Sequence, residues 1–453
     1  MYDVAVIGAG VTGCFIAKEL SKYEVSVVVF EKKSGVGLLQ TKGCSGVIHA
    51  FQFPFSSLRG RLCLEGNKIM DREASELGFE FKRVGLLLLA TNEVSKLMLP
   101  IVKRLLSRHL DVRAVSREEI LATEPNVTER VRGGLLLPSA GVVNPVEMTF
   151  TAFLFAKLNG VDFVFDCEVT GIERRLDRFV IETSKGKFEA RFVVNCAGVY
   201  ADEVARMVGY DLQIKPSKGS HVVFGEKGFT NHMMAAIPLK PKRITGGALV
   251  SVDGKPVWGP NFVEVDDKED TSVTREDIEG IIEEFSHLFR RLPEKPLAYY
   301  AGVMATAGKD FVINQPIRNF INVAGIQSPG LTAAPAIAKL VVRMLATSGL
   351  KLKRKQSLAR FSLRRFAKMS DEERAKLVAE DPRYGRVVCL CNLVTEAEIE
   401  EILKHTPCFD IVKHVTRAGM DCCECHADII IFIQRKLGYS VKDQVKSDLA
   451  WRR

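Results

Sequence analysis

Three glycines near the start of the chain constrain its fold more than any other feature. Gly8, Gly10 and Gly13 follow the apolar run DVAVIG (residues 3–8), and a helical pattern then covers residues 11–21. A second β-branched run, VSVVVF (25–30), ends at Glu31. In a doubly wound parallel sheet this order places a helix N-terminus at a pyrophosphate and an acid at a ribose hydroxyl. The sequence therefore predicts an α/β fold with a Rossmann-like dinucleotide site.

Two later segments follow the same strand–loop–helix order. Short strands over 168–195 lead into VVNCAG (193–198), and a helix is expected from about Ala201 to Val208. A strand at 320–324 precedes a loop with Gly325 and Gly330, and then another helix. The nucleotide-binding half is thus expected to be discontinuous. Alternating patterns over about 82–145 and 211–304 predict an inserted antiparallel sheet that roofs the substrate.

Composition narrows the class of protein. With 453 residues, 47% hydrophobic and 26% charged, the chain is typical of a globular protein of two or three domains. No apolar run reaches the ~18 residues of a membrane span. An apparent strand begins at Asp3 without a basic leader, so a cytoplasmic location is expected. The eleven cysteines are then expected to be thiols or ligands rather than disulfides.

The net charge of +9 is concentrated in one stretch. Lys351 to Lys368 holds eight basic residues and no acidic one. This stretch is either a solvated linker or a docking strip for an acidic partner or an anionic lipid surface. No recognition motif or aromatic interleaving accompanies the charge, so nucleic acid is not an expected partner.

Two cysteine pairs stand in the last quarter of the chain. Cys389 and Cys391 form a C-x-C pair, and Cys422 and Cys425 form a C-x-x-C pair with Cys423 between them. Four thiolates at such spacing are typical of an iron–sulfur cluster, and zinc is the alternative occupant. Whether Cys422 or Cys423 is the third ligand stays open. The remaining cysteines that the pattern assigns to the core are Cys14, Cys44, Cys63, Cys167 and Cys196.

Most of residues 1–350 resembles the FAD-dependent oxidoreductases of the D-amino-acid-oxidase and glycerol-3-phosphate dehydrogenase superfamily. The matching stretches are SGVIHA (45–50), LRGRLCLEGN (58–67), EPNV (124–127), PSAGVVNP (138–145), VVNCAGVYAD (193–202) and GIQSPGLTAAPAIA (325–338). The tail is similar to the [2Fe–2S] domain of bacterioferritin-associated ferredoxin, in DPRYGRVVCLCNLVTEAEI (381–399) and TRAGMDCCEC (416–425). The resemblance implies a FAD domain over 1–350, a basic linker over 351–385 and a small α-rich [2Fe–2S] domain over 386–440. A helix of that domain is expected to start at the capping box of Thr395 and Glu398.

The resemblance also implies site residues. FAD is expected at Gly8, Gly10, Gly13, Glu31, Ala197, Gly198, Gly325, Gly330, Leu331 and Thr332, and the cluster at Cys389, Cys391, Cys422 and Cys425. His221, in the segment KGSH (218–221), and His49, in SGVIHA, are candidates for the base that accepts a substrate proton; the alternative for each is a structural histidine.

The substrate is less constrained. Met304 stands where the family usually has an arginine that binds the substrate anion. Lys309 is the candidate replacement, and Lys240, Lys242 and Arg243 are further cations of the expected roof. The alternative for each of these four residues is a charge that faces solvent and binds no substrate.

The expected activity is oxidation of a small anionic substrate, glycerol 3-phosphate, to dihydroxyacetone phosphate. Electrons would leave through the cluster to a partner protein, in the cytoplasm or at the inner face of the membrane. The alternatives are a 2-hydroxyacid dehydrogenase of the 2-hydroxyglutarate type, and an electron-transfer or assembly subunit without small-molecule turnover.

Overall fold

The first sheet is built from segments that lie far apart in the sequence. In the computed structural model, which describes residues 1–237 and 246–438, β1 (Tyr2–Ile7) pairs in parallel with both β2 and β12. The strands follow the order β10-β11-β12-β1-β2-β9, and β19 pairs with β12 and β18. Their bounds are β2 Val27–Phe30, β9 Val161–Val164, β10 Val169–Arg174, β11 Phe179–Thr183, β12 Gly186–Asn195, β18 Val312–Ile317 and β19 Phe320–Ala324.

Helices of this half pack against one another around α1 (Val11–Leu20). It contacts α5 (Pro145–Leu158) and α8 (Gly330–Thr347), while α2 (Leu58–Leu77) also packs on α8. Buried Lys18 of α1 pairs with Glu73 of α2 at 2.6 Å, so the charge that this contact buries is matched. Of the described helices, α8 alone is long and apolar enough to cross a membrane, and 67% of that span is buried inside the protein. Two short helices, η1 (Gly198–Tyr200) and α6 (Ala201–Arg206), follow β12.

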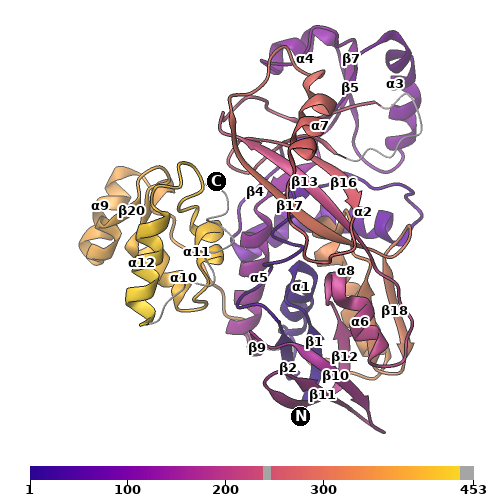
Figure 1. Ribbon diagram of the computed structural model, residues 1–453, viewed down its shortest axis with the longest axis vertical. Helices are drawn as coiled ribbons and strands as arrows, with labels where there is room; N and C mark the ends of the chain where they lie inside the picture. The colour runs from indigo at the N-terminus through magenta and orange to yellow at the C-terminus, as the bar shows by residue number, and fades with distance from the viewer. Residues whose placement is uncertain (238–245, 439–453) are drawn as a thin grey trace.

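A second sheet forms the upper part of the molecule in Figure 1, above the cofactor half. Its order is β17-β13-β16-β15-β14-β5-β7-β6. The prediction of an antiparallel sheet holds for most neighbours but is wrong for β14 and β5, which pair in parallel because the chain reaches β14 only after crossing the cofactor half. The bounds are β5 Leu86–Ala90, β6 Arg113–Val115, β7 Gly133–Leu137, β13 Lys215–Phe224, β14 Met233–Ala236, β15 Gly247–Val250, β16 Pro256–Glu264 and β17 Pro296–Thr306.

The roof carries three helices and joins the lower half through a small sheet. The helices are α3 (Glu93–Leu106), α4 (Arg117–Thr123) and α7 (Arg275–Ser286). The small sheet has the order β3-β8-β4, with bounds Val47–Ile48, Gly141–Val143 and Phe81–Lys82.

The C-terminal part forms a separate group of helices beside α5 (Figure 1). It contains α9 (Asp371–Glu380), η3 (Pro382–Gly385), α10 (Glu396–Leu403), α11 (Phe409–Thr416) and α12 (His426–Leu437), with the short pair β20 (Val387–Cys389) and β21 (Val394–Thr395). The predicted capping box of Thr395 and Glu398 is present at the start of α10.

The basic stretch 351–368 lies along the cofactor half. Parts of it are bonded to that half, so the whole stretch is neither a solvated linker nor an open docking strip. The Lys355 backbone N–H donates to Lys22 O, and its ammonium donates to Asn159 O. Arg365 pairs at 2.7 Å with Glu147, which is almost fully buried. These bonds hold the stretch against the cofactor half, and two of its cations are bonded to groups of that half.

Candidate active site

One cavity of about 1120 Å³ lies between the two halves of the molecule. Residues of β1, β2, η1 and α8 line its lower side, and residues of β13, β14 and β17 line its upper side. The predicted cofactor residues that line it are Gly8, Gly10, Glu31, Ala197, Gly198, Gly330 and Leu331. An organic cofactor would thus meet the substrate roof directly.

The three glycines of the fingerprint are needed for different reasons. Gly8 has a φ of +99°, and a Cβ there would lie 2.5 Å from Cys196 O. A Cβ on Gly13 would lie 2.0 Å from Gly8 O, so Gly13 allows α1 to pack on the turn. Gly10 differs, because its Cβ would meet only Thr41 Oγ1, at 3.5 Å. Its missing side chain leaves room on the cavity side, where a pyrophosphate would approach.

Glu31 is fixed at the end of β2. Its carboxylate accepts hydrogen bonds from Ala9 N at 2.8 Å and from Lys33 N at 2.9 Å. Burial raises the pKa of Glu31, and these two backbone donors partly offset that rise. The carboxylate lines the cavity and is positioned for the hydroxyl groups of a ribose.

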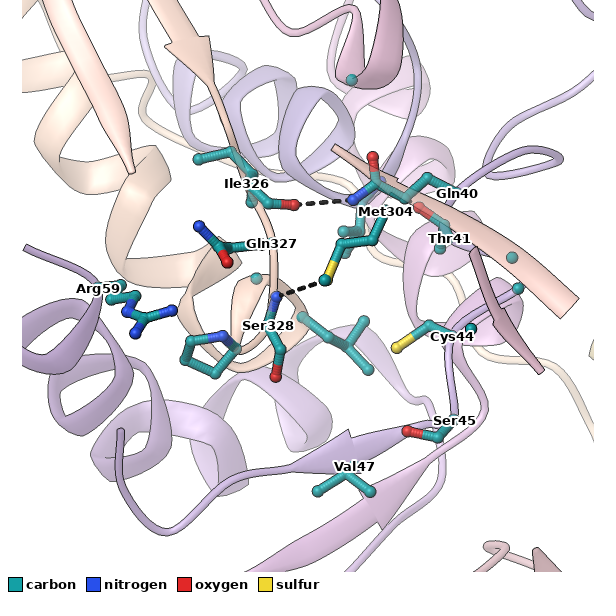
Figure 2. A pocket seen from close by; sticks show the side chains of 18 of the residues that line it. Gln40, Thr41, Cys44, Ser45, Val47, Arg59, Met304, Ile326, Gln327 and Ser328 are labelled. Atoms are coloured by element: carbon teal, nitrogen blue, oxygen red, sulfur yellow. Dashed lines mark hydrogen bonds between the residues drawn. The ribbon is translucent and has the colours of Figure 1, made fainter. Parts of the chain in front are cut away.

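Residues 35–45 form a loop without helix or strand, named here the cofactor loop, which runs along the cavity. Gly37 N donates to Ala9 O, and Val11 N donates to Thr41 Oγ1. Gln40 Nε2 donates to Ile326 O at 2.8 Å, which joins the loop to the segment before α8 (Figure 2). These bonds tie the loop to the start of α1 and to the approach to α8.

The cofactor loop crosses β17 at very close range. A Cβ on Gly43 would lie 2.3 Å from Gly302 Cα, so only glycine fits there.

Three predicted cofactor residues lie behind the cavity wall. Gly13 packs on Gly8, and Gly325 turns the chain with a φ of +62° against Ala307. Thr332 Oγ1 accepts a hydrogen bond from His49 N at 2.9 Å. The structure therefore gives these residues a supporting position rather than a place on the cavity surface.

His221 lies in the middle of β13 and lines the cavity with only 3% of its surface exposed. Its ring stacks on the ring of Tyr300 of β17, with 4.6 Å between the two ring centroids. Neither ring nitrogen has a hydrogen-bond partner of good geometry among the described residues. Burial lowers the pKa of His221 to about 3, with a small opposing effect from the Gly219 backbone. The imidazole is therefore neutral near pH 7, and both of its ring nitrogens are buried.

His49 lines the same cavity but has a partner. Its Nε2 lies 3.0 Å from Ser328 Oγ, and burial lowers its pKa to about 4. Ser328 N in turn donates to the sulfur of Met304 at 3.2 Å, as Figure 2 shows. Met304 thus contacts the loop before α8 with an apolar side chain.

Lys309 and Arg59 are two of the described cations that line the cavity. Lys309 lines it from an exposed position. Arg59 lines it from a buried position near the start of α2 (Figure 2). Asp310 accepts hydrogen bonds there from Leu58 N and Arg59 N. Arg59 was not among the site residues predicted from the sequence, although it lies inside the stretch LRGRLCLEGN. Its charge, in a motif whose other residues pack helices together, could have indicated a role at the site. Lys240, Lys242 and Arg243 lie outside the described residues.

The tail cysteines meet in pairs. Cys391 Sγ lies 3.2 Å from Cys422 Sγ, and the thiols of Cys389 and Cys425 are also hydrogen-bonded. Cys423 has a φ of +63°, and its thiol donates to Gly419 O. The four thiols match the donor chemistry of an iron–sulfur or zinc site. However, no group of three or more His, Cys, Asp or Glu side chains in the described part of the chain is arranged to hold a metal ion.

The cysteines assigned to the core differ in position. Cys14, Cys63, Cys167 and Cys196 are buried. Cys44 is partly exposed and lines the cavity from the cofactor loop.

Comparisons with known proteins place these features in context. The sequence pattern of one family, described as FAD dependent oxidoreductase, matches residues 3–344. A glycerol 3-phosphate dehydrogenase of Caloramator mitchellensis is 34% identical, over 98% of this chain and 96% of that protein. An L-2-hydroxyglutarate dehydrogenase of Escherichia coli (strain UMN026) is 29% identical, over 58% of this chain and 64% of that protein. The solved structure of dithionite-reduced L-alpha-glycerophosphate oxidase from Mycoplasma pneumoniae, with FAD bound, has a TM-score of 0.73 and 27% identity, and covers 80% of this chain and 99% of that one.

Proposed function

The chain belongs to the FAD dependent oxidoreductase family, and from this premise we propose that it oxidises glycerol 3-phosphate to dihydroxyacetone phosphate and exports the electrons through its tail. The observation that carries the proposal is His221, a buried and neutral histidine in the wall of the cavity that holds the glycine fingerprint, whose ring nitrogens have no hydrogen-bond partner of good geometry among the described residues. The similarity to a glycerol 3-phosphate dehydrogenase over nearly the whole chain supports this choice of substrate.

His221 is the group best suited to take the hydroxyl proton. When bound, FAD supplies a hydride acceptor. The imidazole must accept the proton in a site where burial opposes its positive charge, as its pKa of about 3 indicates. A doubly charged phosphate ester within the same cavity would offset that cost, because an opposite charge favours the imidazolium. His221 would therefore be an effective base only with an anionic substrate in place.

The neighbouring groups would orient that substrate. His49 and Ser328 are already hydrogen-bonded to each other, so whichever of the two accepts that bond keeps its own donor for a substrate oxygen. Buried Arg59 and exposed Lys309 both line the cavity. We assign them to the phosphate, in place of the family arginine.

The tail cysteines would hold a one-electron carrier. We propose a [2Fe–2S] cluster at Cys389, Cys391, Cys422 and Cys425, which stores one electron at a time. Cys391 and Cys422 are exposed, and Leu390 beside them is 78% exposed, so a partner protein could reach this edge. The dehydrogenase relative matches 98% of this chain, whereas the oxidase structure matches 80% of it. This difference supports a role for the tail in electron export.

A 2-hydroxyacid substrate is the second candidate. Met304 removes the usual anion contact, and one of the relatives is an L-2-hydroxyglutarate dehydrogenase. The deciding experiment is anaerobic reduction of the FAD-loaded protein with a panel of substrates, followed by the flavin absorbance. Bleaching by glycerol 3-phosphate but not by 2-hydroxyglutarate supports the proposal, and the reverse replaces it. If no substrate of the panel bleaches the flavin, the third reading, a subunit without small-molecule turnover, takes its place.

We also propose that the protein works in the cytoplasm, at the inner face of the membrane. Helix α3 exposes Val94, Leu97, Ile101 and Leu105 by 46–76%, along one face. Lys96, Lys103 and Arg104 are in the same helix. An apolar face flanked by lysine and arginine is typical of helices that lie on anionic bilayers.

Vesicle flotation tests this location. The protein should float with vesicles of phosphatidylglycerol and phosphatidylcholine, and the variant Leu97→Asp/Ile101→Asp should not. Leu176→Asp, at a fully exposed leucine of the β10–β11 turn, is the matched control and should still float. Equal flotation of the α3 variant and the parent, or no flotation of the parent, would exclude α3 as a membrane surface.

A further inference from the structure

Helix α11 of the tail packs directly on the cofactor loop. The sequence match to the FAD family ends at residue 344, while α11 begins at Phe409. Even so, Val36 of the loop and Phe409 and Ile411 of the helix belong to one continuous hydrophobic core. A segment outside the matched family region thus packs against the loop that lines the FAD site.

The closest approach occurs at Gly35. A Cβ at this position would lie 2.7 Å from Ile411 Cδ1 and 3.4 Å from Cys408 Cβ. Ile411 is fully buried, so its terminal methyl group has little freedom to move aside. The loop and the helix are therefore packed with no spare volume between them.

An ion pair fixes the other end of the contact. Lys42 Nζ lies 2.8 Å from Asp410 Oδ2, and both side chains are largely buried. Lys42 N also donates to Gly37 O within the loop, and Gly37 N donates to Ala9 O at the start of the glycine turn. Two successive backbone hydrogen bonds thus connect Lys42, which contacts α11, to Ala9 in the glycine fingerprint.

The far side of α11 is held as firmly. Asn144, which caps α5, donates to His414 O at 3.2 Å. Buried Glu147 of α5 pairs with Arg417 at the end of α11 and with Arg365 of the basic stretch. Because α11 is bonded to the body of the protein on this side, it can act as a fixed support for the loop.

We propose that α11 is a structural part of the FAD site: by holding residues 35–42 against the start of α1, it makes retention of FAD depend on docking of the tail. This inference requires that the cavity binds FAD, but it does not depend on the substrate or on a cluster. By linkage, FAD bound under the loop must stabilise the docked tail to the same extent. The tail therefore has a second role besides electron export.

The test is the rate of FAD release from the full-length holoprotein, followed by the fluorescence of free flavin after dilution. Gly35→Ala adds a methyl group against Ile411, and overpacking of this size should speed release by about tenfold. Ile411→Val removes that Cδ1 atom. The double variant Gly35→Ala/Ile411→Val should therefore release FAD at nearly the rate of the parent, which two independent effects would not produce.

Two charge variants complete the test. Asp410→Asn removes the ion pair without adding volume and should also speed release. Glu401→Gln is the matched control, because its ion pair with Lys404 lies at the C-terminal end of α10 in the tail, and it should leave the rate unchanged. Thermal unfolding of each apoprotein checks that the variants fold.

The outcomes are distinct. Rescue of Gly35→Ala by Ile411→Val, together with slower amide exchange of α11 when FAD is bound, supports the proposal. Unchanged release from both Gly35→Ala and Asp410→Asn overturns it, as does a double variant that releases FAD as fast as Gly35→Ala alone. A protein that fails to oxidise glycerol 3-phosphate would still report these rates, so the two proposals fail separately.

Discussion

Replacing Gly10 with alanine should remove FAD binding without harm to the fold. The backbone at Gly10 has a φ of −69°, which alanine adopts without strain. The new Cβ would approach only Thr41 Oγ1, at 3.5 Å, an ordinary contact distance. The stability of the apoprotein should therefore change by less than about 0.5 kcal/mol.

The cost should appear only when FAD is present. The methyl group would enter the space through which the pyrophosphate passes, and overpacking of a tight site costs about 1–3 kcal/mol. Divided by about 1.4 kcal/mol per factor of ten, this predicts an FAD dissociation constant roughly 5- to 150-fold higher. Fluorescence titration of the apoprotein with FAD measures it.

Gly13→Ala is the matched comparison. Its Cβ would lie 2.0 Å from Gly8 O, so this variant should lose stability even without cofactor. The reasoning is refuted if Gly10→Ala binds FAD as tightly as the parent, or if its apoprotein melts as early as that of Gly13→Ala.

Three further results are expected. His221→Ala should slow anaerobic flavin reduction about 10²–10⁴-fold while FAD affinity is kept; rapid mixing that finds rates within a few-fold of the parent would make His221 structural and leave His49 as the candidate base. The pKa of buried His221 is lowered to about 3, so below about pH 6.5 the unfolded state binds a proton that the folded state does not. The free energy of unfolding should therefore fall by about 1.4 kcal/mol per pH unit from pH 6.5 toward pH 3. His221→Gln should remove this part of the pH dependence in urea unfolding, and an unchanged pH dependence would contradict the assignment. Cys391→Ser should abolish electron delivery to the partner yet leave turnover with a dye that meets the flavin directly; stoichiometric zinc and no paramagnetic reduced cluster in the anaerobic parent would remove the relay.

The parts of the fold that follow local rules could be predicted from sequence. Gly8, Gly10 and Glu31 are set by a strand, a turn and a second strand within a short stretch, so their position at the cavity follows from local geometry. The capping box at Thr395 is equally local. In contrast, α5 is buried on all sides and shows no amphipathic period, which is why the sequence pattern did not reveal it.

The contacts between distant segments could not be predicted. Arg59 reaches the cavity because α2 begins beside Asp310, more than 250 positions away. The parallel pair of β14 and β5 and the docking of α11 on the cofactor loop also depend on three-dimensional closure. No single-sequence period encodes such contacts, since each partner looks like an ordinary surface or core residue by itself.

The strand order of the first sheet has a consequence for synthesis of the protein. Val4 and Val6 of β1 pair with Phe192 and Val194 of β12, which in turn pairs with β19 through Ile321. A ribosome adds about 5–20 residues per second, so β12 (Gly186–Asn195) emerges roughly 10–40 s after β1. During that time the first apolar strands lack a neighbour on one edge, which makes them a template for wrong pairing. Wrong pairing of the N-terminal strands is therefore a risk until about 195 residues have left the ribosome, and slow translation would lengthen that period.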